Sequence, residues 1–485
     1  MATWAAGLRA SDIPADVLDR ARLQTASVLG AVFAGSSGDL APKVRKAAAR
    51  WGSAEDASLI PTGERVPLHT ACYVNAAASV AFDYDDYLFA GHTGHSSVLG
   101  ALAFGEAAGA SGADVLAAQV VGNEVGGRLG AAMLLGPHNG QMWTYIHALE
   151  GACVAGRFLG LDAEAMGNAI GIALAQPPYP LAPAFFGPDS KALMASGPFV
   201  EGIRAAELAA EGVTGAADII GDDNGMLAKI GARPLPFVFS GFGSAWVTSS
   251  LAYKLYPGCA YVDTPVDAFN DIRDAFATKT GRALTPADVG SIRVEATLFT
   301  AGMEALATPY RRRDKLTPVD VNFSVGLSFG VILAAGELSG ETLSARSLEQ
   351  HRETILGVAD RVTVEQVADL SMDVGGLGDL GIEPAELFAG GEGLTLDGKD
   401  FSAFEMRFPS RVTLETAGGE EFTAEVRIPA GAPGRPFDDT RIQVGEKFVR
   451  NARGRIADPD GALEAVLSID SAPDVRAVVE RIVAR

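Results

Sequence analysis

The 485-residue chain has few cysteines and few aromatic residues. Its three cysteines, Cys72, Cys153 and Cys259, lie far apart and form no CxxC pair. The sequence therefore offers no zinc motif and fits a reducing compartment, so we expect a cytoplasmic protein. Aromatic residues make up only 7%, whereas glycine reaches 57 residues. Small residues at this density favour closely packed helices.

Basic residues are also scarce, because 39 lysines and arginines face 60 acidic residues and leave a net charge of −21. A field of that sign repels phosphate backbones and anionic membranes, so we expect neither nucleic acid nor membrane as a partner. An anionic substrate would need a local basic pocket. The start of the chain also lacks the apolar core of a signal peptide, because Asp16, Asp19 and Arg20 stand there.

The periodicity of apolar residues predicts two kinds of domain. From Ile13 to about Gly231 they recur at helical spacing, whereas strand-like alternation begins later, at Ile292. We therefore predict a mostly α fold, with a large all-helical domain and a smaller α+β lid domain. The expected boundaries are 1–259 and 437–485 for the helical domain and 260–436 for the lid, with a Gly- and acid-rich insertion around 373–400.

Residues 81–97 concentrate polar groups in one predicted turn between two helices. The carboxylates, tyrosines and histidines of this segment are Asp83, Tyr84, Asp85, Asp86, Tyr87, His92 and His95. An aspartate beside a histidine orients the ring and raises its basicity, as a general acid or base requires. The alternative is a solvated acidic turn that caps a helix. Because Asp85, His92 and His95 match no specific metal spacing, we expect no metal.

Basic residues stand at three further points of the chain. Lys191 follows a proline-rich loop, where it would hold a carboxylate or act as a base. Lys254 and Cys259 flank a Pro-Gly turn near the predicted domain boundary, where ligand sites are common. The basic run 311–313 would attract an anion to Arg312. The alternatives are a solvated lysine, an ordinary turn with a buried cysteine, and a solvated basic face.

Several blocks, in their order and spacing, resemble the MmgE/PrpD family, which includes methylcitrate dehydratases, cis-aconitate decarboxylases and an iminodisuccinate epimerase. The resemblance covers about residues 18–455. The blocks are 83–86 with the histidine that follows, 112–118, 122–125, 151–162, 191–215, 254–257 and 322–324. Single blocks are weakly specific, but their shared order is a strong indication.

The resemblance implies a helical domain with a smaller lid, a site between the two, a homodimer, and no metal or organic cofactor. It places the family's site on Asp83, Tyr87 (usually threonine), His92 or His95, Lys191, Lys254 and Cys259. We therefore assign catalytic roles to Asp83, His92, His95, Lys191 and Tyr87, and substrate-binding roles to Lys254, Cys259, His147 and Arg312.

The chain departs from the family pattern at three places. The family's His-Pro-Gly/Ser becomes His-Thr-Gly at His92 or His-Ser-Ser at His95. A second His-Pro-Thr site reads Gln-Met-Trp-Thr at 141–144, so its histidine is absent unless His138 or His147 takes its place. Leu327 stands where the family has a tyrosine.

These residues favour a cofactor-independent lyase on a small, anionic polycarboxylate. A proton α to a carboxylate would be removed with loss of water or CO2, and lysines and arginines would stabilise the enolate-like charge. One alternative is an isomerase or epimerase, which needs two opposed proton carriers, such as Lys191 and His95. Another is a non-catalytic binding protein, because the second histidine and the tyrosine of the family are missing.

Overall fold

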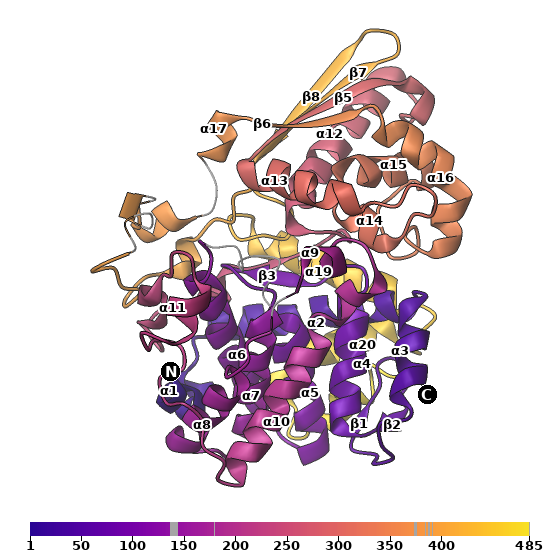
Figure 1. The fold of residues 1–485 in the computed structure, drawn as a ribbon. Helices are drawn as coiled ribbons and strands as arrows, with labels where there is room; N and C mark the ends of the chain where they lie inside the picture. Colours follow the sequence, from indigo (N-terminus) through magenta and orange to yellow (C-terminus); the bar gives the residue numbers. More distant parts are fainter. Residues whose placement is uncertain are drawn as a thin grey trace.

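The computed structural model describes residues 1–135, 144–178, 180–372, 376–383, 385–386, 389 and 391–484. Helices dominate, and the longer strands gather in one small sheet. Figure 1 shows a helical body below and a smaller part that contains this sheet above. The predicted mostly α fold class is therefore confirmed.

The body is built mainly from the first half of the chain. Its helices are α1 Ala2–Gly7, α2 Ala15–Ser36, α3 Leu40–Ala48, α4 Leu68–Val80, α5 Gly94–Ala108, α6 Gly112–Ala132, α7 Thr144–Phe158, α8 Ala163–Ala173, α9 Ala182–Phe185, α10 Ser196–Ala210 and α11 Met226–Ile230. Local signals set their ends. The Ser111 and Asp162 side chains accept hydrogen bonds from the first backbone N–H groups of α6 and α8. Gly109, at φ 63°, ends α5 in the left-handed region.

Glycine lets the helices α7 and α10 approach until their backbones touch. A Cβ atom at Gly202 would overlap the carbonyl oxygen of Ala148, and one at Gly151 would overlap that of Phe199. These glycines therefore permit the close helix packing that the glycine content of the sequence predicted. Helix α7 carries part of the candidate site, so this contact also fixes the position of the site.

The last helices return to the body, as Figure 1 shows by placing α19 and α20 among the N-terminal helices. They are α19 Phe437–Ala452, α20 Pro459–Leu467 and α21 Arg476–Val479. The Phe448 ring packs edge-on against Phe33 of α2, with the ring centroids 5.3 Å apart. A Cβ at Gly30 would come within 3.4 Å of the Phe448 Cα, so α2 and α19 cross closely.

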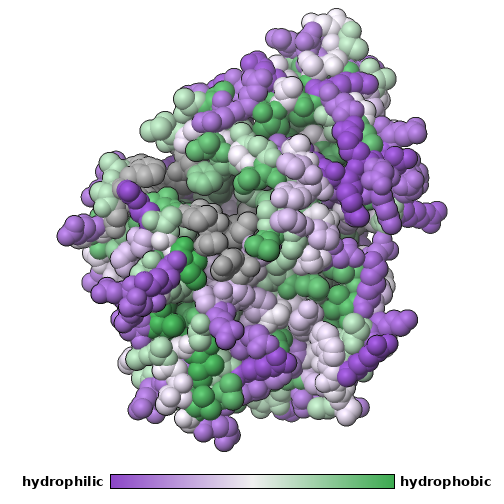
Figure 2. Space-filling view, viewed as in Figure 1, coloured by the Kyte–Doolittle hydropathy of each residue, from purple (hydrophilic) through white to green (hydrophobic). Residues whose placement is uncertain are grey.

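The upper part holds most of a second hydrophobic core, to which Phe82 and Phe185 of the body also contribute. Its elements are α12 Asp263–Thr280, β5 Val289–Ala296, α13 Leu298–Ala307, α14 Pro318–Asn322, α15 Val325–Ala335, α16 Ala345–Ala359, β6 Val362–Gln366, α17 Ala368–Ser371, β7 Ser410–Thr416 and β8 Glu421–Val426. The sheet order is β6-β5-β7-β8, in which β5 and β6 are parallel and the other pairs antiparallel. Figure 2 shows hydrophilic side chains gathered over the region of α16, away from the body.

The described parts of segment 373–400 pack on the helical body. The Leu396 backbone N–H donates to Ser240 Oγ at 2.8 Å, and Ser244 Oγ donates to Asp397 Oδ1 at 2.5 Å. Leu396 itself is fully buried in the core of the body. Across the described residues, no helix combines the length and the apolar character that a bilayer crossing requires.

A short antiparallel pair of strands positions the candidate site. Strand β3 Asp86–Leu88 pairs with β4 Leu251–Tyr253, so that Asp86 faces Tyr253. Beyond the paired residues, the Lys254 backbone N–H donates to the Asp85 carbonyl oxygen at 3.2 Å. This pairing brings the polar turn near residue 85 beside Lys254, which lies far away in the sequence.

We predict that Gly202→Ala destabilises the protein by about 1–3 kcal/mol or more, because the new methyl group must push α7 and α10 apart. Urea unfolding followed by circular dichroism measures the change. Gly197→Ala in the same helix is the control, since a methyl group at that position would have no heavy atom within 4 Å. The control should be as stable as the wild type or up to about 1 kcal/mol more stable. Equal stability of both variants would contradict the packing argument.

Candidate active site

Asp83 lies between two buried lysines. Lys191 Nζ is 2.9 Å from Asp83 Oδ2, and Lys254 Nζ is 2.8 Å from Asp83 Oδ1. Burial alone would raise the pKa of Asp83, but the two ammonium groups lower it to about 2. The carboxylate is therefore ionised and links three segments of the chain.

The three segments reach Asp83 from different elements. Asp83 follows the end of α4 in a left-handed conformation, with φ 52°, which a residue other than glycine seldom adopts. Lys191 lies in a short 3-10 helix, Asp189–Leu193, before α10. Lys254 follows β4, and the Gly258 backbone N–H binds the Asp83 carbonyl oxygen at 3.1 Å. The strained turn thus aims the Asp83 carboxylate at both lysines.

Asp85 brings His92 and His95 together, the latter from the first turn of α5. Its Oδ2 lies 2.9 Å from His92 Nδ1 and 2.9 Å from His95 Nε2, while its Oδ1 is 3.1 Å from Lys254 Nζ. Burial would raise the pKa of Asp85, but His95 and Lys254 hold it well below its ordinary value. An ionised carboxylate only accepts hydrogen bonds, so both of these ring nitrogens donate.

The tautomer of His92 follows from its neighbours. His92 Nδ1 faces two acceptors, Asp85 Oδ2 and the Asp86 carbonyl oxygen, each at 2.9 Å. Nδ1 therefore carries the proton. Burial lowers the pKa of His92 although Asp85 opposes this shift, so the ring is neutral and its lone pair is on Nε2. Such a ring is set up to act as a base.

A third histidine reaches the same cavity from α7. His147 Nδ1 is 2.8 Å from Ser96 Oγ, and the ring centroids of His147 and His95 are 5.8 Å apart. Burial holds the pKa of His147 well below its ordinary value. The cavity measures about 40 Å³ and is lined by Val80, Asp83, His92, His95, Thr144, His147, Phe185, Lys191, Met194 and Ala195. That volume suits one or two water molecules.

Besides Lys254, two sequence-predicted residues lie near this cluster without lining the cavity. Tyr87 is buried on β3, and within the described part of the chain its hydroxyl has no hydrogen-bond partner. Cys259 is buried, and burial raises the pKa of its thiol to about 12, so the thiol is protonated at neutral pH. The catalytic role of Tyr87 and the substrate-binding role of Cys259 stay predictions, because neither residue lines the cavity.

The basic run 311–313 lies in the upper part and does not join the cluster. Arg311 pairs with Glu304 at 2.7 Å and Arg313 pairs with Asp360 at 2.8 Å. The Arg312 side chain is exposed, and its backbone N–H donates to Asp320. These arginines are therefore not part of the described cavity wall. His138 and Gln141 fall outside the described residues.

Asp85, His92 and His95 also offer three metal-ligand atoms within 4.8 Å of one another. Two histidines and a carboxylate are a common donor set for Fe²⁺ or Zn²⁺. Here the Lys254 ammonium already pairs with the Asp85 carboxylate, and both histidines donate hydrogen bonds to that carboxylate. A cation at this point would face that ammonium, so we interpret the group as a hydrogen-bonded cluster. The absence of a metal stays a prediction.

The sequence did not single out Lys447, whose contacts hold the backbone of the cluster together. Its buried Nζ donates to the carbonyl oxygens of Tyr84 at 2.5 Å and Lys254 at 2.9 Å, and to Ser27 Oγ at 2.9 Å. These contacts tie the aspartate turn to the Lys254 turn. A signal was present, because Lys447 falls on the apolar stripe of its helix, between Val444 and Phe448.

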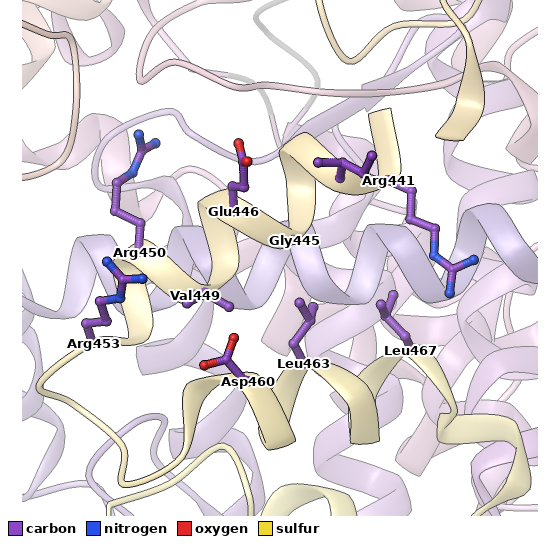
Figure 3. Close-up of a pocket in the computed structure, with 10 residues that line it drawn as sticks. Arg441, Gly445, Glu446, Val449, Arg450, Arg453, Asp460, Leu463 and Leu467 are labelled. Carbon is purple, nitrogen blue, oxygen red and sulfur yellow. The ribbon is translucent and has the colours of Figure 1, made fainter. Parts of the chain in front are cut away.

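The other face of α19 borders a larger cavity that is separate from this site. It measures about 640 Å³ and lies between α19 and α20. Figure 3 shows Leu463 and Leu467 pointing from α20 toward α19, with Arg441 and Arg450 near its two ends. The lysines and histidines of the candidate site do not line it.

Comparisons with known proteins place the chain in a family. Residues 1–235 match the MmgE/PrpD N-terminal domain. The chain belongs to the MmgE/PrpD family. It is 25% identical to a cis-aconitate decarboxylase of Aspergillus terreus, over 98% of this chain and 94% of that protein. A second A. terreus sequence of the same name is 26% identical over the same shares.

A shorter similarity links this MmgE/PrpD chain to a cis-aconitate decarboxylase-like protein, oryM, of Aspergillus oryzae. The two are 31% identical over 36% of this chain and 39% of that protein. The family resemblance drawn from the sequence blocks is therefore confirmed. Asp83, His92, His95, His147 and Lys191 all fall within the matched family domain, whereas Lys254 and Lys447 lie beyond it.

Asp86 gives this MmgE/PrpD protein a predictable pH dependence. Its Oδ2 accepts from Gln24 Nε2 at 2.7 Å, and burial together with the nearby Asp85 raises its pKa to about 7. The folded state therefore binds a proton that the unfolded chain, with an aspartate pKa of about 3.9, has lost. The contribution of Asp86 to stability is fully present below about pH 4 and is lost as the pH rises to about 7.

We predict that Asp86→Asn flattens the fall of the melting temperature between about pH 4 and pH 7, because the amide cannot ionise. Thermal unfolding of wild type and variant across this range measures the effect. Other buried acids are the same in both proteins, so their contributions cancel in the comparison. An unchanged slope in the variant would show that Asp86 does not titrate in this range.

Proposed function

We propose that this protein is a lyase that releases CO2 from a small unsaturated polycarboxylate of the cis-aconitate type. Support comes from one arrangement, in which Lys191, His92, His95 and His147 line one cavity beside the buried pair of Asp83 and Lys254. The near full-length similarity to two cis-aconitate decarboxylases points to the same class of reaction.

The lysines supply the positive charge that such a reaction needs. When the C–CO2⁻ bond breaks, its electron pair moves into the unsaturated system next to a remaining carboxylate, and negative charge builds there. Lys191 lines the cavity and is the cation that a substrate carboxylate can reach. Lys254 lies behind Asp83 and holds that aspartate in place.

The charge balance of the cluster makes substrate binding dependent on protons. Among the groups paired directly with one another, Asp83 and Asp85 carry two negative charges, and Lys191 and Lys254 carry two positive ones. An entering anion is therefore uncompensated until a buried histidine takes up a proton. His92, whose pKa burial lowers in the resting state, gains proton affinity beside that anion. Decarboxylation then consumes one proton, which is added to a carbon of the unsaturated system that received the electron pair.

Loss of water and epimerisation are alternative reactions of the same groups, because both begin with proton removal α to a carboxylate. They differ in their products and in solvent exchange. We further propose that the enzyme works without metal or organic cofactor, as a homodimer in the cytoplasm, and binds neither nucleic acid nor membrane.

The test is an NMR assay of the purified protein in deuterated buffer that contains excess chelator. Cis-aconitate, citrate-like, tartrate-like and amino-dicarboxylate compounds are supplied in turn. We expect CO2 release from an unsaturated tricarboxylate and the incorporation of one solvent deuterium on a carbon of the product. Solvent exchange without CO2 or water loss would assign an isomerase. Thermal stabilisation without turnover would assign a binding protein, and activity that only a metal restores would contradict the metal-free proposal.

We predict that His92→Ala and His95→Ala each lower kcat at least about 100-fold, because a positioned acid or base contributes that much to the rate. Steady-state kinetics on the substrate from the NMR assay measures the loss, and circular dichroism shows whether the variants fold. His351→Ala on α16 is the control and should keep full activity, since its ring lies outside the cavity. Full activity in both single variants and in the double variant refutes the assignment.

A further inference from the structure

Glu150 is a buried acid that the proposed mechanism does not use. It lies on α7, three residues after His147, and its side chain is fully buried. Glu150 Oε2 hydrogen-bonds to Ser96 Oγ, and Ser96 Oγ lies 2.8 Å from His147 Nδ1. The three side chains therefore form a chain of hydrogen bonds that ends at a histidine of the cavity wall.

The surroundings of Glu150 favour its neutral form. Within the described ranges its only ion-pair partner is His147, at 3.4 Å, and its Oε1 has no hydrogen-bond partner. A buried carboxyl without a close counter-charge keeps its proton. Burial and the nearby Asp86 accordingly raise the pKa of Glu150 well above its ordinary value. Burial of His147 lowers the pKa of that ring, so the pair is neutral.

We propose that Glu150 is a positioning residue that fixes the tautomer of His147 through Ser96. In this proposal the contact of Ser96 Oγ with Glu150 Oε2 has the protonated carboxyl as its donor, and the Ser96 hydroxyl donates in turn to His147 Nδ1. His147 then carries its proton on Nε2. A neutral imidazole holds only one proton, so the direction of this hydrogen-bond chain decides which nitrogen has it.

The consequence is an acid and a base of the same residue type in one cavity. His92 receives no proton on Nε2, because Asp85 and the Asp86 carbonyl hold its proton on Nδ1. His147 has the opposite tautomer and acts as the proton donor. This pairing rests on the proposed function for its role in turnover, but the protonation state of Glu150 is measurable without any substrate.

The alternative arrangement is an ion pair in which Glu150 is a carboxylate and His147 is an imidazolium. Glu150→Gln separates the two. Its amide group can donate to Ser96 Oγ but cannot ionise, so it preserves the proposed direction and removes the charge of the alternative. Glu150→Ala and Ser96→Ala break the chain in both arrangements.

Infrared spectroscopy and kinetics on these variants test the proposal. Burial also raises the pKa of Asp86 and Asp263, so the test uses the difference between the spectra of the wild type and Glu150→Gln, in which we expect the carbonyl band of one protonated carboxyl. The same variant should keep kcat within about threefold, whereas Glu150→Ala and Ser96→Ala should each lose at least about tenfold, as expected for residues that orient a reacting group. If Glu150→Ala fails to fold, Ser96→Ala supplies the broken chain.

The matched control is Glu124→Gln on the neighbouring helix α6. Glu124 is equally buried but binds the Arg128 guanidinium and the Thr248 backbone N–H, so its substitution should leave the protonated-carboxyl band in place. A Glu150→Gln protein that keeps the full protonated-carboxyl intensity of the wild type overturns the proposal. So does one that loses the band but is as impaired as Glu150→Ala. Failure of the proposed function would remove only the kinetic comparison, because the infrared result needs no substrate.

Discussion

The contact of the Asp83 carboxylate with Lys191 and Lys254 is the interaction on which the site depends. It joins the end of α4, the approach to α10 and the turn after β4, and it holds Asp83 in a left-handed conformation. Removing one partner of such a buried ion pair costs about 3–5 kcal/mol, because a charge stays behind without compensation. The same contact holds the Lys191 side chain at the cavity wall.

Helix α19, the first of the three helices that return to the body, completes the site. Lys447 binds the backbone of both the aspartate turn and the Lys254 turn, and Arg450 binds the Tyr84 hydroxyl at 2.6 Å. Residues 1–235, which match the MmgE/PrpD N-terminal domain, supply the histidines and Lys191 but not these supports. The geometry of the cluster is therefore a property of the whole chain.

Hydrogen-bond directions divide the histidines by role. His92 is held by acceptors and keeps a lone pair, whereas His147 receives a hydrogen bond and keeps a proton at the opposite nitrogen. Both rings are neutral because burial disfavours the charged form. A neutral resting cluster is suited to bind an anionic substrate together with one proton.

The sequence by itself determined the helical class, the strands near Ile292 and the polar turn at 83–95, because periodicity and local composition are written along the chain. It also singled out Lys191 and Lys254. Only the tertiary structure decided that Arg312 faces solvent and that Lys447 reaches the aspartate turn. Only the tertiary structure shows that Glu150 contacts Ser96, because burial and contact between distant segments depend on how the helices pack.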